Sequence, residues 1–287
     1  MSDTEATGYA DVASWELSDS LWARIEPLLP KVKSRYRGRG KNRKHIGGRP
    51  IADRRKVLSG ILYILRTGCQ WNALPQATYG SGKTAHSYFQ KWTRAGVFRR
   101  MWAVGLAEYD ELKGIAWKWQ AADGAMTKAP LGGQKTGPNP TDRAKRGTKR
   151  SLLVDEHGVP LGLVVSGANT PDGKLLEATL TSGPVERPDP SETPQHLCLD
   201  KAYSDVPSAK VAEAHGYVLH VPDKANAKKK RARQPGRRKA RRWIVEVAHG
   251  WLNRFRRLLV RWEKKASNYL SLLSFACAII CWRKCEV

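Results

Sequence analysis

The sequence predicts an α/β fold, a mixed central sheet flanked by helices, preceded by an all-α domain. Two short apolar runs, 151–154 and 159–165, are separated by an acidic, Gly-containing turn, which is typical of a β-hairpin. A strand–helix–strand pattern follows between residues 196 and 221, whereas apolar residues in the first third recur at helical spacing. We therefore divide the chain into a flexible tail (1–16), a helical domain (17–112) and an α/β domain (113–287).

The helical domain has the pattern of a helix-turn-helix. Helices are expected at residues 17–29, 52–66, 84–95 and 97–106. Gly68 and Pro75 interrupt the chain between the second and third of these helices. The third helix is predicted to present four DNA-contacting side chains: His86, Gln90, Lys91 and Arg94. The same pattern also occurs in three-helix bundles that bind no DNA.

The net charge identifies the class of partner. Lys and Arg outnumber Asp and Glu by 51 to 26, which gives a formal charge of +25. Such an excess favours a polyanion, either nucleic acid or an anionic membrane surface. The most apolar stretch, 269–282, is fourteen residues long and too short to span a bilayer, so we expect a buried helix there. The chain opens with acidic and polar residues and no signal segment, so we expect a cytoplasmic DNA-binding protein without a membrane partner.

Two basic segments are candidate phosphate-binding regions. Residues 31–49, rich in Lys, Arg and Gly, are either a solvated linker or a flexible arm that contacts DNA. Residues 223–242 carry eleven Lys and Arg against one Asp and cannot form a core. We expect this second segment to be a loop whose cations bind DNA, among them Lys229, Arg231, Arg237 and Arg238.

Two strand-like runs in the α/β domain end in acids. Asp123 follows the apolar run 117–122, and Asp200 follows the run 196–199. Carboxylates that meet at one edge of a sheet can hold a hard cation such as Mg²⁺. Asp155, Asp172 and Asp205 are rival acids; Asp155 lies at a hairpin turn and Asp172 at a helix start, positions that structure alone explains.

A third acid, Glu246, lies on a basic helix predicted over residues 241–264. Its polar face carries Arg242, Glu246, Gly250, Asn253 and Arg257 at steps of four, three and four. Glu246 is either paired with Arg242 on a solvated face or is a metal ligand beside a phosphate-binding surface. His249, one turn further, either contacts substrate or is structural.

These motifs resemble those of a known family. The N-terminal segment GRPIADRRKVLSGILYILRTGCQWNALP is followed by TAHSYFQKWTRAGVF, and then by ADGAMTKAP, KRSLLVDEHGVPLGLVVSGANTPD, LCLDKAYSD and RRWIVEVAHGWLNRFRRLLVRWEK. In content and order they resemble the DDE transposases of bacterial insertion sequences, specifically the insertion-sequence-five family. The resemblance covers nearly the whole chain from Leu17.

The resemblance implies a ribonuclease-H-like catalytic domain whose acidic triad is Asp123, Asp200 and Glu246. The family signature around the third acid is Tyr, two residues, Arg, three residues, Glu, six residues, Lys. Arg242 and Glu246 fit it, whereas Lys239 and Asn253 replace the Tyr and the Lys. Further candidates for DNA contacts near the triad are Lys201, Arg254 and Arg257.

The resemblance also implies a reaction. Two Mg²⁺ ions, for which Mn²⁺ can substitute, would support cleavage at terminal inverted repeats and transfer of the 3′-hydroxyl to target DNA by transesterification. Joining two element ends implies a homodimer or higher oligomer on double-stranded DNA, associated with the bacterial nucleoid. The alternatives are a non-catalytic DNA-binding regulator derived from a transposase and a metal-dependent nuclease without strand transfer.

Overall fold

The computed structural model describes residues 16–31, 36–37, 41, 44–45, 51–222 and 242–286 of the chain. The chain forms two compact units that divide between residues 97 and 98, whereas the sequence placed the division after residue 112. The difference is helix α5 (Val97–Lys113), which packs within the second unit. Its Trp102 indole donates to the Pro160 carbonyl, and Gly105 lies against α9 (Ala266–Cys285).

The first unit is helical, as predicted. Helix α1 (Asp19–Ile25) is capped by Ser18 and continues into η1 (Glu26–Leu28). Helix α2 (Arg54–Thr67) ends at Gly68, which adopts a left-handed φ of 75°. After η3 (Trp71–Ala73) and α3 (Gln76–Tyr79), helix α4 (Gly82–Arg94) buries Ala85, Phe89 and Trp92. The basic arm includes two short paired strands that the sequence did not predict, β1 (Tyr36–Arg37) and β2 (Lys44–His45).

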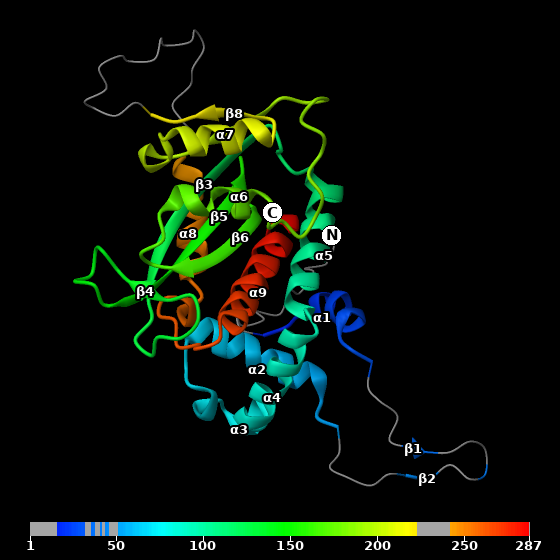
Figure 1. Ribbon diagram of the computed structural model, residues 1–287. Helices are drawn as coiled ribbons and strands as arrows, with labels where there is room; N and C mark the ends of the chain where they lie inside the picture. The colour runs from blue at the N-terminus through cyan, green and yellow to red at the C-terminus, as the bar shows by residue number, and fades with distance from the viewer. Residues whose placement is uncertain are drawn as a thin grey trace, which may run out of the picture. The chain divides into compact units, whose positions relative to one another are not determined.

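The second unit is built on a mixed sheet (Figure 1). The strands lie in the order β6–β5–β3–β7–β8, with the short β4 paired to β5. The pairs β6–β5 and β5–β3 are antiparallel, whereas β3–β7 and β7–β8 are parallel. The strand bounds are β3 Trp119–Lys128, β4 Gly137–Pro138, β5 Arg146–Asp155, β6 Pro160–Gly167, β7 Gln195–Cys198 and β8 Tyr217–His220. The hairpin (β5–β6) and the parallel strand–helix–strand unit are therefore confirmed.

Helices cover the sheet around these strands (Figure 1). Along β5, Ser151 faces α6 (Leu176–Leu180), which follows η4 (Asp172–Leu175), because the Thr179 hydroxyl donates to the Ser151 hydroxyl. The neighbouring Arg150 faces α8 (Trp243–Asn253), since its guanidinium donates to Asn253. Successive strand residues point to opposite faces, so α6 and α8 lie on opposite faces of the sheet. Helix α7 (Val206–Ala214), which follows η5 (Lys201–Tyr203), packs beside β8.

Two sequence predictions about this unit are wrong. Strand β3 does not end at Asp123 but continues to Lys128, because β5 pairs with it along its whole length. The predicted helix 241–264 ends at Asn253 and is followed by η6 (Arg256–Leu258) and an extended segment, in which Arg261 N–H donates to the Lys128 carbonyl at 2.8 Å. The apolar spacing suggested a longer helix because Phe255 and Leu258, which lie beyond the end of α8, are also buried.

The buried helix predicted at residues 269–282 is confirmed as part of α9, whose residues from Leu272 to Trp282 are all buried. Across the part of the chain that the structure describes, no helix is both long and apolar enough to cross a membrane.

Candidate functional site

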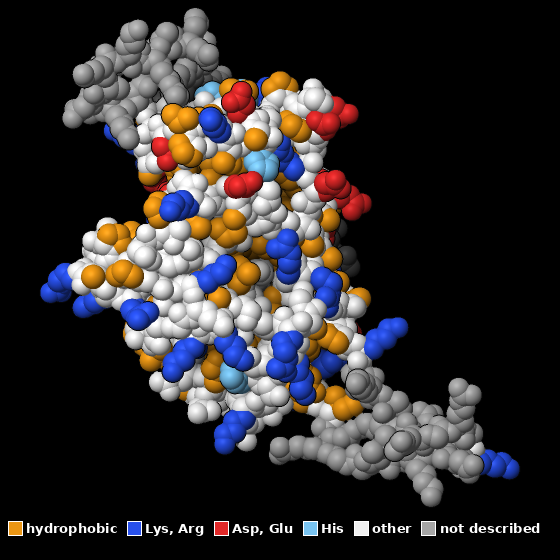
Figure 2. All heavy atoms as spheres, viewed as in Figure 1, with side chains coloured by type: hydrophobic (Ala, Val, Ile, Leu, Met, Phe, Trp, Pro, Cys, Tyr) orange, Lys and Arg blue, Asp and Glu red, His pale blue; other side chains and the backbone are white. Residues whose placement is uncertain are grey.

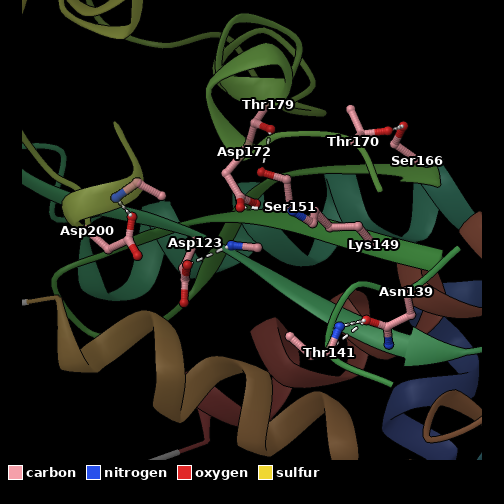
Figure 3. A network of polar contacts seen from close by, with 12 residues as sticks. Asp123, Asn139, Thr141, Lys149, Ser151, Ser166, Thr170, Asp172, Thr179 and Asp200 are labelled. Atoms are coloured by element: carbon pink, nitrogen blue, oxygen red, sulfur yellow. Dashed lines mark hydrogen bonds and ion pairs between the residues drawn. The ribbon is translucent and has the colours of Figure 1, made fainter. Parts of the chain in front are cut away.

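The β3–β7 pair places Asp123 and Asp200 near each other. Ala121 pairs with Cys198, and each aspartate lies two residues further along its own chain. Because alternate strand residues share a face, continuing that register places both carboxylates on one side of the sheet. Figure 3 shows the two side chains close together, from β3 and from the turn after β7. Asp200, unlike Asp123, does follow the end of its strand, as predicted.

Asp123 is held in an electrostatically unfavourable position. Its carboxylate accepts one backbone hydrogen bond, from the Gly124 N–H at 2.8 Å. Partial burial is the main cause that raises the pKa of Asp123, and the negative charges of Asp200 and Asp172 act in the same direction. The Gly124 hydrogen bond and the Arg242 charge oppose them, and the net pKa is about 6. A positive ion at this position would relieve both the burial cost and the repulsion.

Arg242 links the other two predicted acids. Its guanidinium lies 2.9 Å from a Glu246 carboxylate oxygen and 3.8 Å from one of Asp200. Asp200 also accepts the Ala202 N–H at 2.8 Å. Glu246 lies in the first turn of α8, and its side chain is 54% exposed, so the Arg242 pair is open to solvent. An exposed ion pair exchanges partners at little cost, so the pairing with Arg242 leaves Glu246 able to bind a metal ion.

Asp172 lies against the triad region from the other side of the sheet. It accepts a hydrogen bond from the Lys149 ammonium at 2.8 Å (Figure 3). A Cβ on Gly124 would lie 2.1 Å from an Asp172 carboxylate oxygen, so only glycine at position 124 permits this approach. Asp172 is thus more than a helix-start residue. The sequence feature that could have indicated this role is the pair of cations Lys149–Arg150, because charged residues directly before a buried apolar run need an acidic partner.

The other rival acids are structural. Asp155 is fully buried and accepts the backbone N–H groups of His157 and Val159, which closes the hairpin turn. Asp205 caps α7 by accepting the Ser208 N–H at 3.0 Å. These contacts explain both residues without chemistry.

His249 is buried and lies one turn along α8 from Glu246. Its imidazole is 7% exposed and donates to the backbone carbonyl of Asp123 at 3.4 Å. Burial lowers its pKa to about 3, and the nearby Arg150 charge acts in the same direction, so the ring is neutral. Of the two predicted roles the contacts favour the structural one, because the ring connects α8 to the strand that carries Asp123.

Of the DNA-contacting residues predicted near the three acids, some are exposed and one is buried. Lys201, Arg254 and Asn253 are exposed, although Asn253 also accepts the Arg150 guanidinium at 2.5 Å. Arg257 does not fit the prediction, because it is 7% exposed and paired with the buried Glu263 at 2.7 Å. Arg257 does not share a helix face with Glu246, because α8 ends at Asn253 and Arg257 lies in η6.

In the first unit, His86, Lys91 and Arg94 are exposed on α4, and Gln90 is half-buried. The His86 ring lies 4.8 Å from the Trp71 ring, so part of its surface is committed to packing. Lys229, Arg231, Arg237 and Arg238 lie outside the described residues.

The acids are near one another but are not arranged as a closed ligand set. Within residues 16–31, 51–222 and 242–286, no group of three or more His, Cys, Asp or Glu side chains is close enough to hold a metal ion. The Arg242 guanidinium lies beside two of the acids instead.

Two protein-family models match the chain and together span most of it. The model described as "Transposase DDE domain" matches residues 120–281, more than half of the chain, and includes all three acids. The model described as "Putative transposase of IS4/5 family" matches residues 17–102. The chain therefore belongs to the DDE transposases of insertion sequences, and the resemblance seen in the sequence is confirmed. The family match together with the strand order also confirms the ribonuclease-H-like fold of the second unit.

Two similar proteins come from Burkholderia cepacia. The "Putative transposase for insertion sequence element IS402" is 34% identical over 154 residues, which are 53% of this chain and 70% of that protein. The "Insertion element IS402 uncharacterized 16.2 kDa protein" is 36% identical over 125 residues, 43% of this chain and 80% of that protein.

Among solved structures, the catalytic domain of Mos1 mariner transposase is 10% identical, with 68% of this chain and 92% of that chain covered and a TM-score of 0.28. This similarity is too weak to support any conclusion about the present chain.

Proposed function

We propose that this transposase binds the terminal inverted repeats of its element, cleaves the DNA there and joins the freed 3′-hydroxyl to target DNA. The observation that carries the proposal is the position of Asp123: a half-buried carboxylate with a raised pKa beside Asp200, in a domain that matches the DDE model. Concerted joining of two ends requires two active sites, so we expect a homodimer or a larger assembly on double-stranded DNA.

Asp123, Asp200 and Glu246 would hold the divalent metal, Mg²⁺ or Mn²⁺. The donor chemistry fits, because hard cations prefer carboxylate oxygens and Asp123 has few competing hydrogen bonds. When bound, a pair of such ions activates a water molecule or hydroxyl and stabilises the leaving oxygen of the phosphodiester.

The chain's own residues would orient the acids and the DNA. Through its hydrogen bond to the Asp123 carbonyl, His249 fixes α8, and with it Glu246, relative to β3. Arg242 pairs with Glu246 and lies near Asp200, and we expect it to transfer to a DNA phosphate when DNA enters. Lys201 and Arg254, both exposed in this region, would contact neighbouring phosphates.

The test is cleavage and strand transfer by the full chain on labelled DNA that carries the element ends, with Mg²⁺ or Mn²⁺. Asp200→Asn and Glu246→Gln are expected to lower the rate at least a thousandfold, because each removes a charged metal ligand while preserving shape. Glu177→Gln, an exposed acid on α6, is the matched control and should retain wild-type activity.

The other outcomes identify the alternatives. Metal-dependent cleavage without joined products would indicate a nuclease. Specific binding of the ends with no product under either metal would indicate a non-catalytic regulator. Full activity of Asp200→Asn or Glu246→Gln would show that the proposed triad is wrong.

A further inference from the structure

The loop between β3 and β5, residues 129–145, is an exposed basic surface. With the two strand residues that flank it, it carries five exposed cations: Lys128, Lys135, Arg143, Lys145 and Arg146. The single acid of this segment, Asp142, lies 3.6 Å from the Lys128 ammonium. In Figure 2, Lys and Arg side chains gather at the tip of the projection that carries β4 in Figure 1. The segment therefore has an excess of four positive charges, five cations against one acid.

Unusual backbone conformations are concentrated in this loop. Lys135, Arg143 and Ala144 have φ values of 52°, 48° and 56°, and they are the three non-glycine residues with positive φ among those that the structure describes. A non-glycine residue in the left-handed region costs about 1–3 kcal/mol and persists only where its surroundings determine it fully. Such strain concentrates at functional sites, which makes this loop a candidate.

The tip of the loop is held by Asn139. Its side-chain oxygen accepts the N–H and the hydroxyl of Thr141 at 3.0 and 2.9 Å (Figure 3). Its backbone carbonyl accepts the Ala144 N–H at 3.0 Å, and its own N–H donates to the Lys145 carbonyl at 2.8 Å. These bonds fix the backbone that presents Arg143 and Lys145.

The base of the loop is held by a buried arginine. Arg261, 1% exposed, donates to the carbonyl oxygens of Gln134 and Lys135 at 2.5 and 3.1 Å and to the Thr148 hydroxyl at 3.0 Å. The Gln134 N–H in turn donates to the Lys264 carbonyl at 2.8 Å. The loop is therefore rigid before any ligand arrives, and binding would carry little ordering cost.

The position of the loop relates it to the candidate active site. Strand β3 runs from Asp123 to Lys128, where the loop begins, and five residues at about 3.3 Å per residue span about 16 Å. Along B-DNA, at about 3.4 Å per base pair, this distance corresponds to about five base pairs.

We propose that the β3–β5 loop is a preformed phosphate-binding surface for the duplex whose reacting phosphodiester lies at Asp123. It binds the sugar–phosphate backbone about five base pairs from that bond, through Arg143, Lys145 and their basic neighbours. This inference rests on the proposed function, because it takes Asp123 as the reaction centre. The duplex is either the element end or the target DNA, both of which present the same phosphates.

The test is DNA binding by the full chain carrying Arg143→Gln and Lys145→Gln, measured over a range of salt concentrations. The logarithm of the binding constant falls with log salt concentration by about 0.9 per phosphate contact. The double variant, which lacks two contacts, should therefore show a slope that is less steep by about 2. Ethylation of phosphates about five base pairs from the reacting bond should weaken DNA binding by the wild-type protein and should not change DNA binding by the variant. Duplexes that carry only an element end or only target sequence distinguish the two sources of DNA.

The matched control is Lys113→Gln with Lys210→Gln, which removes the same charge from two exposed lysines outside the loop. An equal fall in slope for the control variant, or an unchanged ethylation pattern in the loop variant, would overturn the proposal. A duplex truncated three base pairs from the reacting bond should bind wild type and the loop variant equally. Because these are binding measurements, an inactive protein that still shows the loop effect would refute the proposed reaction and not the DNA contact.

Discussion

Two arginine–glutamate pairs of similar length lie at the two ends of the segment from α8 to the start of α9, in opposite environments. Arg257 and Glu263 are 2.7 Å apart, with 8% and 5% of their side chains exposed. Arg242 and Glu246 are 2.9 Å apart, with 38% and 54% exposed. Burial makes a change of partner costly, because an unpaired charge remains behind, whereas an exposed pair is released into water cheaply. The first pair therefore stabilises the fold, and the second leaves both residues available for DNA or metal.

The largest effect should come from breaking the buried pair. Arg257→Met leaves the Glu263 carboxylate buried without its partner, so we expect the free energy of unfolding to fall by about 3–5 kcal/mol. Arg242→Met should lower it by about 1 kcal/mol or less. Urea unfolding of the full chain measures both, with the unfolding of the two compact units followed separately where they do not unfold together.

Adding Glu263→Leu to Arg257→Met sharpens the comparison. Without the buried carboxylate, much of the lost stability should return. Similar losses for Arg257→Met and Arg242→Met would contradict the assignment of one pair to the fold and the other to ligand binding.

The buried face of α8 should also respond to acid differently from its exposed face. Native His249 stays neutral because its pKa is about 3, whereas the unfolded chain binds a proton at this residue below about pH 6.5. The His249 contribution to stability is therefore complete above pH 6.5 and falls by up to about 1.4 kcal/mol per pH unit as the pH drops toward 3. Between pH 6.5 and 5 this amounts to about 2 kcal/mol.

Urea unfolding at pH 7 and pH 5, for wild type and His249→Gln, measures this contribution. The variant should lose less stability between the two pH values, since other titrating groups contribute equally to both proteins. An identical loss would mean that His249 is protonated in the native state.

The sequence located the elements that carry two of the proposed acids better than the third. Asp200 follows a strand and Glu246 lies on a helix, and the periodicity of both elements is visible in the sequence. The extension of β3 past Asp123 was missed because its pairing with β5 is a long-range contact and Gly124 lacks an apolar side chain.

The burial of Arg257 could not be predicted from the spacing of residues in the sequence. Spacing of three and four residues predicts one helix face, but the chain leaves the helix after Asn253 and buries the arginine against Glu263. Asp172 was set aside as a helix-start residue for a related reason, since its approach to Gly124 from the opposite face of the sheet is a long-range contact. In both cases tertiary packing places a charge that local pattern cannot locate.

The smallest effect on stability should come from Glu246→Gln. The exposed i,i+4 pair with Arg242 contributes about 0.3–0.5 kcal/mol, so in EDTA the variant should unfold almost like wild type. Addition of Mn²⁺ should separate the two proteins, because a metal that binds only the native state stabilises it by RT ln(1 + [L]/Kd) and the variant has lost a ligand. Thermal unfolding with EDTA and with Mn²⁺ makes the comparison, and Glu177→Gln is the control. If Mn²⁺ stabilises wild type and Glu246→Gln equally, Glu246 is an exposed ion-pair partner and no metal ligand.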